Sequence, residues 1–244
     1  MNDEPYRWLE AVANRREYIR DQLKGATPVF AFSRPEGILL LGVGSGQSKV
    51  FEIYDRLALA ALGHPVDIEK IRQTVIEAAH LEGFTRSPED VTLRRLLNFS
   101  LGPALKTSFE QILAAPLMVE CVFAELEARG GQDVLARVSF DGTYRYEDHG
   151  VVVVHTERDA EKAAAAWLRE QLQAGMHLGA VRRLALAAWT ALAADKPFTA
   201  RTEASVEDAL AGLSRDGRVV ECALLDRRSR GRIRYRTLEP AEWL

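Results

Sequence analysis

The chain has 244 residues, of which 47% are hydrophobic and 27% charged, and its formal net charge at pH 7 is −3. This size allows one well-buried hydrophobic core, and nothing in the composition calls for a second domain. The charge balance gives no overall attraction to nucleic acid or to an anionic membrane, and no apolar run approaches the roughly 20 residues that span a bilayer. We therefore expect one soluble domain over residues 1–244.

The N-terminal residues and the two cysteines indicate a cytoplasmic protein. The first residues include Asp3 and Glu4 and lead into a charged segment, whereas a signal peptide has a basic start and an apolar middle. Cys121 and Cys222 each lie in an apolar stretch that is typical of a strand. This placement favours two buried thiols in a reducing compartment over a disulfide.

The chain opens with a predicted helix over residues 3–23. Asp3 can cap it, Pro5 suits its first turn, and Gly25 ends it. Apolar residues recur within it at helical spacing: Trp8, Leu9, Val12, Ile19 and Leu23. After this helix the helical spacing of apolar residues is replaced by short apolar runs with turn residues between them. Four strands are therefore expected over 29–33, 38–41, 50–53 and 57–62. Residues 42–46 are interpreted as a flexible glycine-rich connection.

Two helices are predicted next, over residues 66–82 and from residue 87 to about 113. The second opens where Ser87 can cap, Pro88 fits the first helical position and acidic residues follow. Gly102 and Pro103 are expected to kink it. Strands return at 117–126 and 134–140, and Asp141-Gly142 indicates a hairpin whose second strand ends near Val154.

The last third alternates again between helices and strands. Residues 156–159 resemble a capping box that opens an alanine-rich helix to residue 173. A further helix, a polar loop and two final strands are expected over 178–193, 195–205, 218–225 and 232–237.

The order of the elements predicts the fold class. Helices come in pairs between blocks of strands rather than singly after each strand, which argues against a doubly wound parallel fold and for antiparallel sheets. The prediction is an α+β fold, a four-layer αββα sandwich in which helix pairs flank two antiparallel sheets.

The residue patterns argue against a metal site, a phosphate-binding loop and a nucleic-acid site. No metal site and no cofactor are expected, because the five histidines have no metal-like spacing with each other or with the cysteines: His64, His80, His149, His155 and His177. The stretch 42–46 lacks the lysine and hydroxyl of a phosphate-binding loop. The arginines of 227–236 alternate in part with Ile233 and Tyr235, which favours an exposed edge over a nucleic-acid site.

Several segments, in this order and spacing, resemble the α-type subunits of proteasome core particles, most of all those of actinobacteria. They are Gly25-Ala26-Thr27, Gly37-Ile38-Leu39-Leu40, the block 49–56, Gly63 with Asp67, and Gly83-Phe84-Thr85 with Asp90-Val91-Thr92 and Leu96. The resemblance covers roughly the first two-thirds of the chain. It implies the Ntn-hydrolase sandwich, with residues 1–24 as the N-terminal ring and gate helix and residues 25–244 as the sandwich.

The same resemblance implies a function without chemistry of its own. An α-type subunit forms an outer heptameric ring, templates the ring of β subunits, restricts the entry of unfolded protein substrates and docks a ring-shaped ATPase or another activator. In that family the lysine matching Lys49 binds the activator's C-terminal carboxylate in a pocket between neighbouring subunits, where an ammonium pairs strongly with it. The matching pocket positions are Gly25 and His64.

An alternative hypothesis is a self-processing N-terminal-threonine hydrolase, either β-type or a stand-alone proteasome-like peptidase. Thr27 matches the position of the β-type nucleophile and Lys49 that of its lysine. Three features argue against it. Val43 stands where the β-type acid would be, Pro28 follows Thr27, and an amphipathic helix rather than a propeptide leads the chain.

Overall fold

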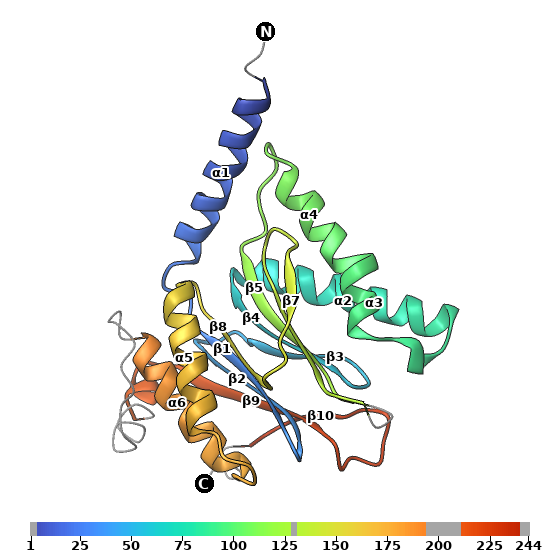
Figure 1. Cartoon of the computed structure of the whole chain (residues 1–244), viewed down its shortest axis with the longest axis vertical. Helices are drawn as coiled ribbons and strands as arrows, with labels where there is room; N and C mark the ends of the chain where they lie inside the picture. The colour runs from blue at the N-terminus through green and yellow to red at the C-terminus, as the bar shows by residue number, and fades with distance from the viewer. Residues whose placement is uncertain (1–3, 128–130, 194–210, 240–244) are drawn as a thin grey trace.

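Two five-stranded antiparallel sheets lie face to face at the centre of the computed structural model, which describes residues 4–127, 131–193 and 211–239 (Figure 1). The first sheet has the order β10-β9-β2-β1-β8, formed by Tyr235–Thr237, Val219–Asp226, Gly37–Gly44, Val29–Arg34 and Val151–Val154. The second has the order β3-β4-β5-β6-β7, formed by Val50–Tyr54, Leu57–Gly63, Val119–Glu125, Val134–Val138 and Tyr144–Tyr146. Every neighbouring pair is antiparallel.

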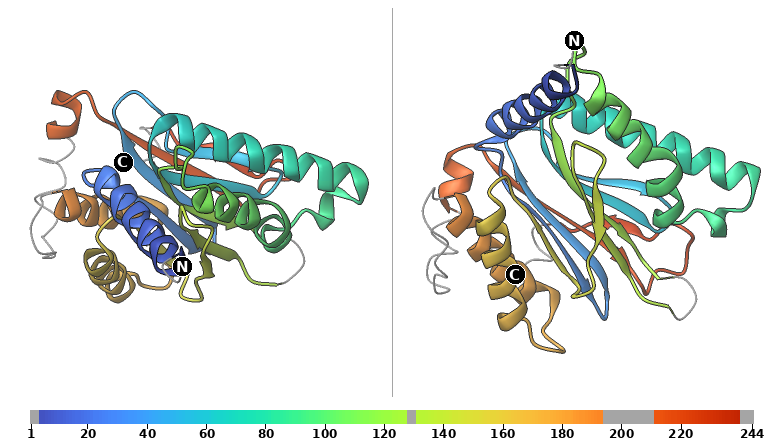
Figure 2. Two further views of the ribbon diagram at one scale, coloured as in Figure 1. Left: turned by 90° about the horizontal axis from the view of Figure 1, so that it is seen from above. Right: turned by 45° about the horizontal axis from the view of Figure 1, so that its top comes forward.

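Helices cover the outer face of each sheet, so the predicted four-layer sandwich is confirmed (Figure 2). Helices α5 (Arg158–Gln171) and α6 (Leu178–Ala193) pack on the first sheet. Helices α2 (Pro65–Thr85), α3 (Leu93–Leu96) and α4 (Gly102–Glu110) pack on the second. A helical segment over residues 211–215 precedes β9. Helix α1 (Glu4–Leu23) projects from one end of the sandwich.

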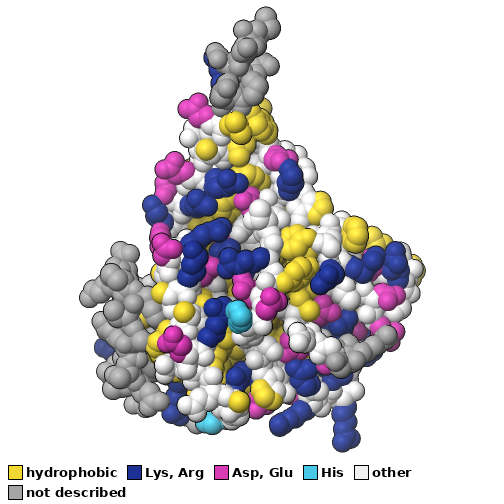
Figure 3. All heavy atoms as spheres, in the orientation of Figure 1, with side chains coloured by type: hydrophobic (Ala, Val, Ile, Leu, Met, Phe, Trp, Pro, Cys, Tyr) yellow, Lys and Arg dark blue, Asp and Glu magenta, His cyan; other side chains and the backbone are white. Residues whose placement is uncertain are grey.

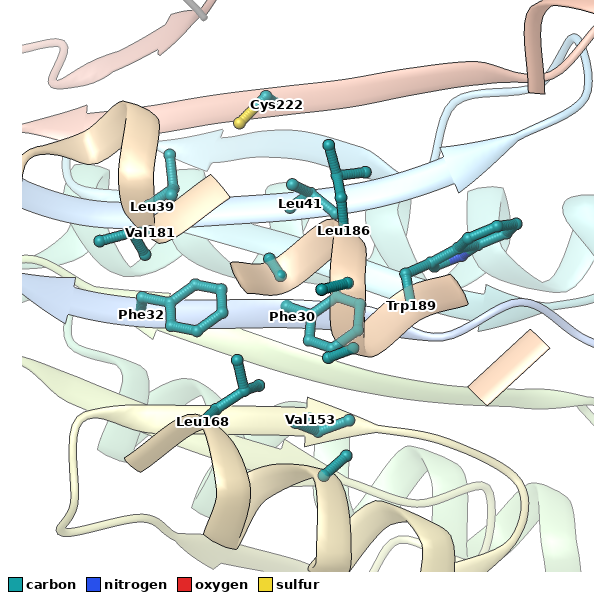
Figure 4. Packing of buried hydrophobic residues seen from close by; sticks show 14 of the residues in the cluster. Phe30, Phe32, Leu39, Leu41, Val153, Leu168, Val181, Leu186, Trp189 and Cys222 are labelled. Atoms are coloured by element: carbon teal, nitrogen blue, oxygen red, sulfur yellow. The ribbon is translucent and has the colours of Figure 1, made fainter. Parts of the chain in front are cut away.

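The central strands, such as β2 and β4, are apolar on both faces because the sheets are covered on both sides there. In β2, Ile38 and Leu40 point into the core between the sheets, whereas Leu39 and Leu41 point outward. Figure 4 shows this outward set, in which the phenylalanines of β1 and the leucines of β2 meet side chains from α5 and α6. All eight residues of β2 are buried.

Gly63 ends β4 at a position that only glycine fits. Its φ is +135°, and a Cβ there would lie 2.1 Å from the carbonyl oxygen of Met118. The close approach lets the strand turn directly into α2, whose first residue is Pro65.

Two predicted elements are wrong in ways that have tertiary causes. The strand ending at Val154 is not an arm of the hairpin at Asp141-Gly142. That turn joins β6 to β7, while β8 pairs with β1 in the other sheet. The connection at 42–46 is also shorter than expected, because β2 continues to Gly44 alongside β9.

The helix predicted from residue 87 to about 113 differs from the structure in where it begins, is interrupted and ends. Ser87 caps only a 3₁₀ turn, η1 (Pro88–Asp90). The α-helix begins after Thr92, whose hydroxyl accepts the N–H of Arg95 and caps it. Just before that cap, Arg56 donates to the carbonyl of Val91 at 3.0 Å. The interruption expected at Gly102 is a π-helical turn, η2 (Leu97–Leu101), and α4 ends at Glu110 rather than near residue 113.

The capping box expected at residues 156–159 is also wrong. Helix α5 begins after Glu157, whose side chain makes no capping bond. Glu161 instead accepts the backbone N–H of His155 at 3.1 Å. The polar loop at 195–205 lies outside the described residues. No helix in the described part of the chain is long and apolar enough to cross a membrane.

A buried ionic cluster closes one end of the space between the sheets. Arg137 on β6 lies 2.8 Å from a carboxylate oxygen of Glu120 on β5 and 2.9 Å from one of Glu161 on α5. Ser139 bridges Arg137 and Glu120. All four side chains are at least nine-tenths buried, so the guanidinium compensates two carboxylates that water does not reach.

Replacing Arg137 with methionine is therefore expected to lower the free energy of unfolding by about 3–5 kcal/mol, because Glu120 would remain buried without its cation and Glu161 would keep only the half-exposed Arg145. Urea unfolding at neutral pH measures this change. The control is Arg86→Met, which removes an exposed pair with Glu82 and should cost less than about 1 kcal/mol. Equal losses in the two variants would contradict the assigned role of Arg137.

Candidate functional site

A pocket of about 270 Å³ opens at the end of the sandwich where α1 joins β1. Its walls come from four parts of the chain: the link between α1 and β1, the end of β2 with the loop after it, the start of α2, and the residue before β9. The lining residues are Gly25, Ala26, Thr27, Val43, Gly44, Ser45, Gln47, Ser48, Lys49, Gly63, Pro65, Ile68 and Arg218. The fold thus brings Gly25, Thr27 and Lys49 into one site.

Lys49 is half-buried in this pocket, and its ammonium group is held by one residue. Its Nζ donates to the hydroxyl of Thr27 at 2.6 Å and to the carbonyl oxygen of Thr27 at 3.1 Å. A lysine ammonium has three N–H donors, so one is left for a ligand. Among the described residues, no carboxylate lies within ion-pairing distance of Nζ. Gly42 makes room for the side chain, because a Cβ on Gly42 would lie 3.0 Å from that of Lys49.

The pocket makes the charged form of Lys49 less favourable. Burial lowers the pKa of Lys49 from 10.5 to about 8, and the positive charge of Arg218 acts in the same direction. The negative charge of Glu221 opposes both effects. An anion entering the pocket would favour the protonated form again, so the geometry suits a carboxylate ligand.

Glu221 is a site residue that the sequence reasoning missed. It lies on β9 opposite Gly42, and its Oε2 accepts the backbone N–H groups of Lys49 and Val50 at 2.7 and 3.2 Å. Burial raises the pKa of Glu221, while these two N–H bonds oppose the rise. Its carboxylate therefore fixes the backbone at Lys49. The only hint in the sequence is one acidic residue within the apolar run 219–225.

His64 does not line the pocket. It is an exposed residue just before α2, and its backbone N–H donates to the carbonyl of Met118 at 2.9 Å. Its neighbours Gly63 and Pro65 do line the pocket, which puts His64 beside the site.

Thr27 has the hydroxyl–ammonium contact of the alternative hypothesis but lies within a continuous chain. Its hydroxyl donates to the carbonyl of Val43 at 2.7 Å and accepts from Lys49. Its nitrogen is part of the peptide bond to Ala26. An α-amino base at Thr27 would exist only after residues 1–26 were removed.

Removing the leading segment would open the core. Ile19 and Leu23 of α1 are 0% and 3% exposed and belong to the cluster between the sheets. Arg15 anchors the helix by donating to the carbonyls of Ser108, Ile112 and Ala114. Farther out, Trp8 and Leu9 are exposed, and apolar side chains are visible along the projecting helix (Figure 3).

The other regions considered from the sequence have structural roles. Three arginines of the 227–236 stretch pair with acids, namely Arg227 with Asp133, Arg232 with Asp55 and Arg236 with Asp226. Cys121 and Cys222 are buried free thiols. No three potential metal ligands of the histidine, cysteine or acidic types gather anywhere in the described ranges.

Comparison with known proteins finds relatives over most of the chain, although no family model matches it. A proteasome subunit alpha of Thermomonospora curvata is 28% identical over 233 residues, which are 95% of this chain and 91% of the relative. Those of Actinosynnema mirum and Streptomyces scabiei are each 32% identical, over 75% and 73% of this chain and 68% and 71% of their own lengths.

The lowered pKa of Lys49 predicts a pH-dependent effect on stability. Between about pH 8 and 10.5 the unfolded chain holds this proton and the folded chain does not, so the free energy of unfolding rises with pH across that window, by at most about 3 kcal/mol. Lys49→Met removes this effect. Urea unfolding from pH 7 to 10.5 should show wild type gaining stability relative to the variant; parallel profiles would mean that Lys49 titrates normally.

Proposed function

Because the chain belongs to the family of proteasome α subunits, we propose that it is a non-catalytic subunit of a cytoplasmic proteasome core particle. One α-type domain over residues 1–244 would form a homo-heptameric ring with α1 at its entrance. The ring would template the β subunits, restrict the entry of unfolded protein substrates, and dock a ring-shaped ATPase or other activator. Proteolysis would belong to the assembled particle, with nucleophiles supplied by the β subunits.

Lack of catalysis is supported by three features of the Thr27 region. The nitrogen of Thr27 is an amide, Val43 contributes its backbone carbonyl where a β-type subunit has an acid, and the preceding helix is packed into the core through Ile19 and Leu23. The second candidate function, a self-processing threonine hydrolase, is favoured by a single observation, the 2.6 Å contact between Lys49 and Thr27.

Docking of an activator's C-terminal carboxylate at Lys49 is the part of the proposal that the geometry supports best. The observation that carries it is a half-buried ammonium in a pocket, held among the described residues only by the oxygens of Thr27. A terminal carboxylate would supply the missing negative charge. Gly25 would form part of the same wall, and His64, beside the rim, would be close to the entering chain.

The mass of the purified protein tests the choice between the two functions. We expect denatured mass spectrometry to find a chain that retains residues 1–26 apart from any loss of Met1, because α1 is part of the core. Native mass spectrometry should find heptamers that bind proteasome β subunits when the two are produced together. A chain that begins at Thr27 and hydrolyses peptides by itself would overturn the proposal.

Docking at Lys49 predicts binding that depends on a free C-terminus and on pH. An uncharged hexapeptide with a free carboxylate should bind the full chain, and its amidated form should not. Because Lys49 loses its proton near pH 8, affinity should fall about tenfold between pH 7 and pH 9. Lys49→Gln should remove the carboxylate dependence.

The matched control is Lys106→Gln, which changes an exposed lysine paired with Glu110 on α4. It should bind the peptide as wild type does. Equal binding of the free and amidated peptides by wild type would exclude the docking role.

A further inference from the structure

The docking pocket contains a second cation, Arg218. It lies one residue before β9, is half-buried, and lines the same pocket as Gly25, Thr27 and Lys49. No sequence motif around Arg218 indicates a binding site, because the residue follows a polar turn and precedes an ordinary apolar strand.

The chain holds Arg218 in place through its backbone and through an aromatic ring. Gly217, with φ of +65°, closes a helical turn, and the N–H of Arg218 donates to the carbonyl of buried Leu213 at 2.8 Å. The guanidinium carbon lies 5.8 Å from the centre of the Trp189 ring, and Trp189 is 4% exposed. A cation–π contact holds the guanidinium by its charge and uses none of its N–H groups, so these can still bind an anion.

The described part of the chain does not use the donors of this guanidinium. In residues 4–127, 131–193 and 211–239 no acceptor is within hydrogen-bonding distance of the Arg218 side chain, and no carboxylate forms an ion pair with it. Arg227, which follows the other end of β9, is by contrast paired with Asp133. A cation that lines a pocket and has no acceptor among the described residues has the features of a binding group.

The charges around the pocket define the ligand. Lys49 and Arg218 contribute two positive charges, and Arg218 acts on Lys49 as a repelling charge. Glu221 contributes one negative charge, and its Oε2 is occupied by backbone N–H groups. The balance is one positive charge, which a single carboxylate neutralises. A second acid close to the first would meet Glu221 and be repelled.

We infer that Arg218 is a second carboxylate-binding residue of the pocket, which with Lys49 holds one terminal carboxylate of a polypeptide whose preceding residue is uncharged. The inference rests on the proposed docking function. Arg218 supplies the fork of two N–H donors that matches a carboxylate, and Lys49 supplies a point charge in the same pocket.

The test measures binding of the free-carboxylate hexapeptide to full-length Arg218→Gln, Arg218→Lys and Arg215→Gln. Arg215 is the matched control, since it is an exposed arginine three residues earlier that does not line the pocket. Loss of a charge-assisted hydrogen bond should weaken binding about tenfold in Arg218→Gln. The affinity of Arg218→Lys for the peptide should lie between those of wild type and Arg218→Gln, and the affinity of Arg215→Gln should equal that of wild type.

A pH profile separates binding from a structural role. Removing the Arg218 charge should move the midpoint of the affinity loss to higher pH, because Lys49 is no longer repelled. Arg215→Gln should leave the midpoint unchanged. Two ligand comparisons complete the test: aspartate before the last residue should weaken binding to wild type, and inorganic phosphate should compete more weakly than the free peptide.

The possible failures are distinguishable. If Lys49→Gln abolishes carboxylate-dependent binding but Arg218→Gln binds as wild type does, this inference is wrong and the docking function stands. If wild type does not distinguish free from amidated peptide, the docking function itself fails. Tighter binding of the aspartate peptide or of phosphate would overturn the assignment of a singly charged ligand.

Discussion

The structure depends on burying both faces of two stacked sheets. Strand β2 is buried along its whole length between β1 and β9, with alternate side chains directed to the inter-sheet core and to α5 and α6. Polar side chains cannot enter such strands without partners, so they collect where the strands end. The pocket is one of these ends, where β2 stops at Gly44 and the chain returns as β3 from Val50. The core thus determines where a charged site can form.

Two charged clusters at the ends of the sandwich show opposite electrostatic arrangements. Around Arg137 the charges are enclosed and compensated, with carboxylates on two sides and a serine bridging them. Around Lys49 the charge is incompletely compensated, since Glu221 binds backbone N–H groups and Arg218 adds a second cation. The first arrangement stabilises the fold. The second is costly to an isolated chain and becomes favourable when an anion binds.

The contact between Thr27 and Lys49 shows why fold-level similarity does not identify a catalytic centre. A hydroxyl and an ammonium 2.6 Å apart could support nucleophilic chemistry if Thr27 were the first residue. In this chain Thr27 follows helix α1 in the sequence, and Ile19 and Leu23 of that helix belong to the core. The same geometry can therefore form a reactive dyad or the wall of a binding pocket. Which of the two it forms depends on whether the nitrogen of Thr27 is a free amine or part of a peptide bond.

The sequence by itself determined most of the elements and their order, because periodicity, glycine and proline positions act within a few residues. The hairpin at residues 34–37, the β6–β7 turn at Asp141-Gly142 and the helix at 178–193 all follow from such local signals. It also singled out Gly25, Thr27 and Lys49, through their family resemblance. Only the tertiary structure decided that β8 pairs with β1, that Glu221 fixes the backbone at Lys49, and that Arg218 lines the pocket. These contacts join residues far apart in the chain, and their energies depend on burial and distance, which no local pattern specifies.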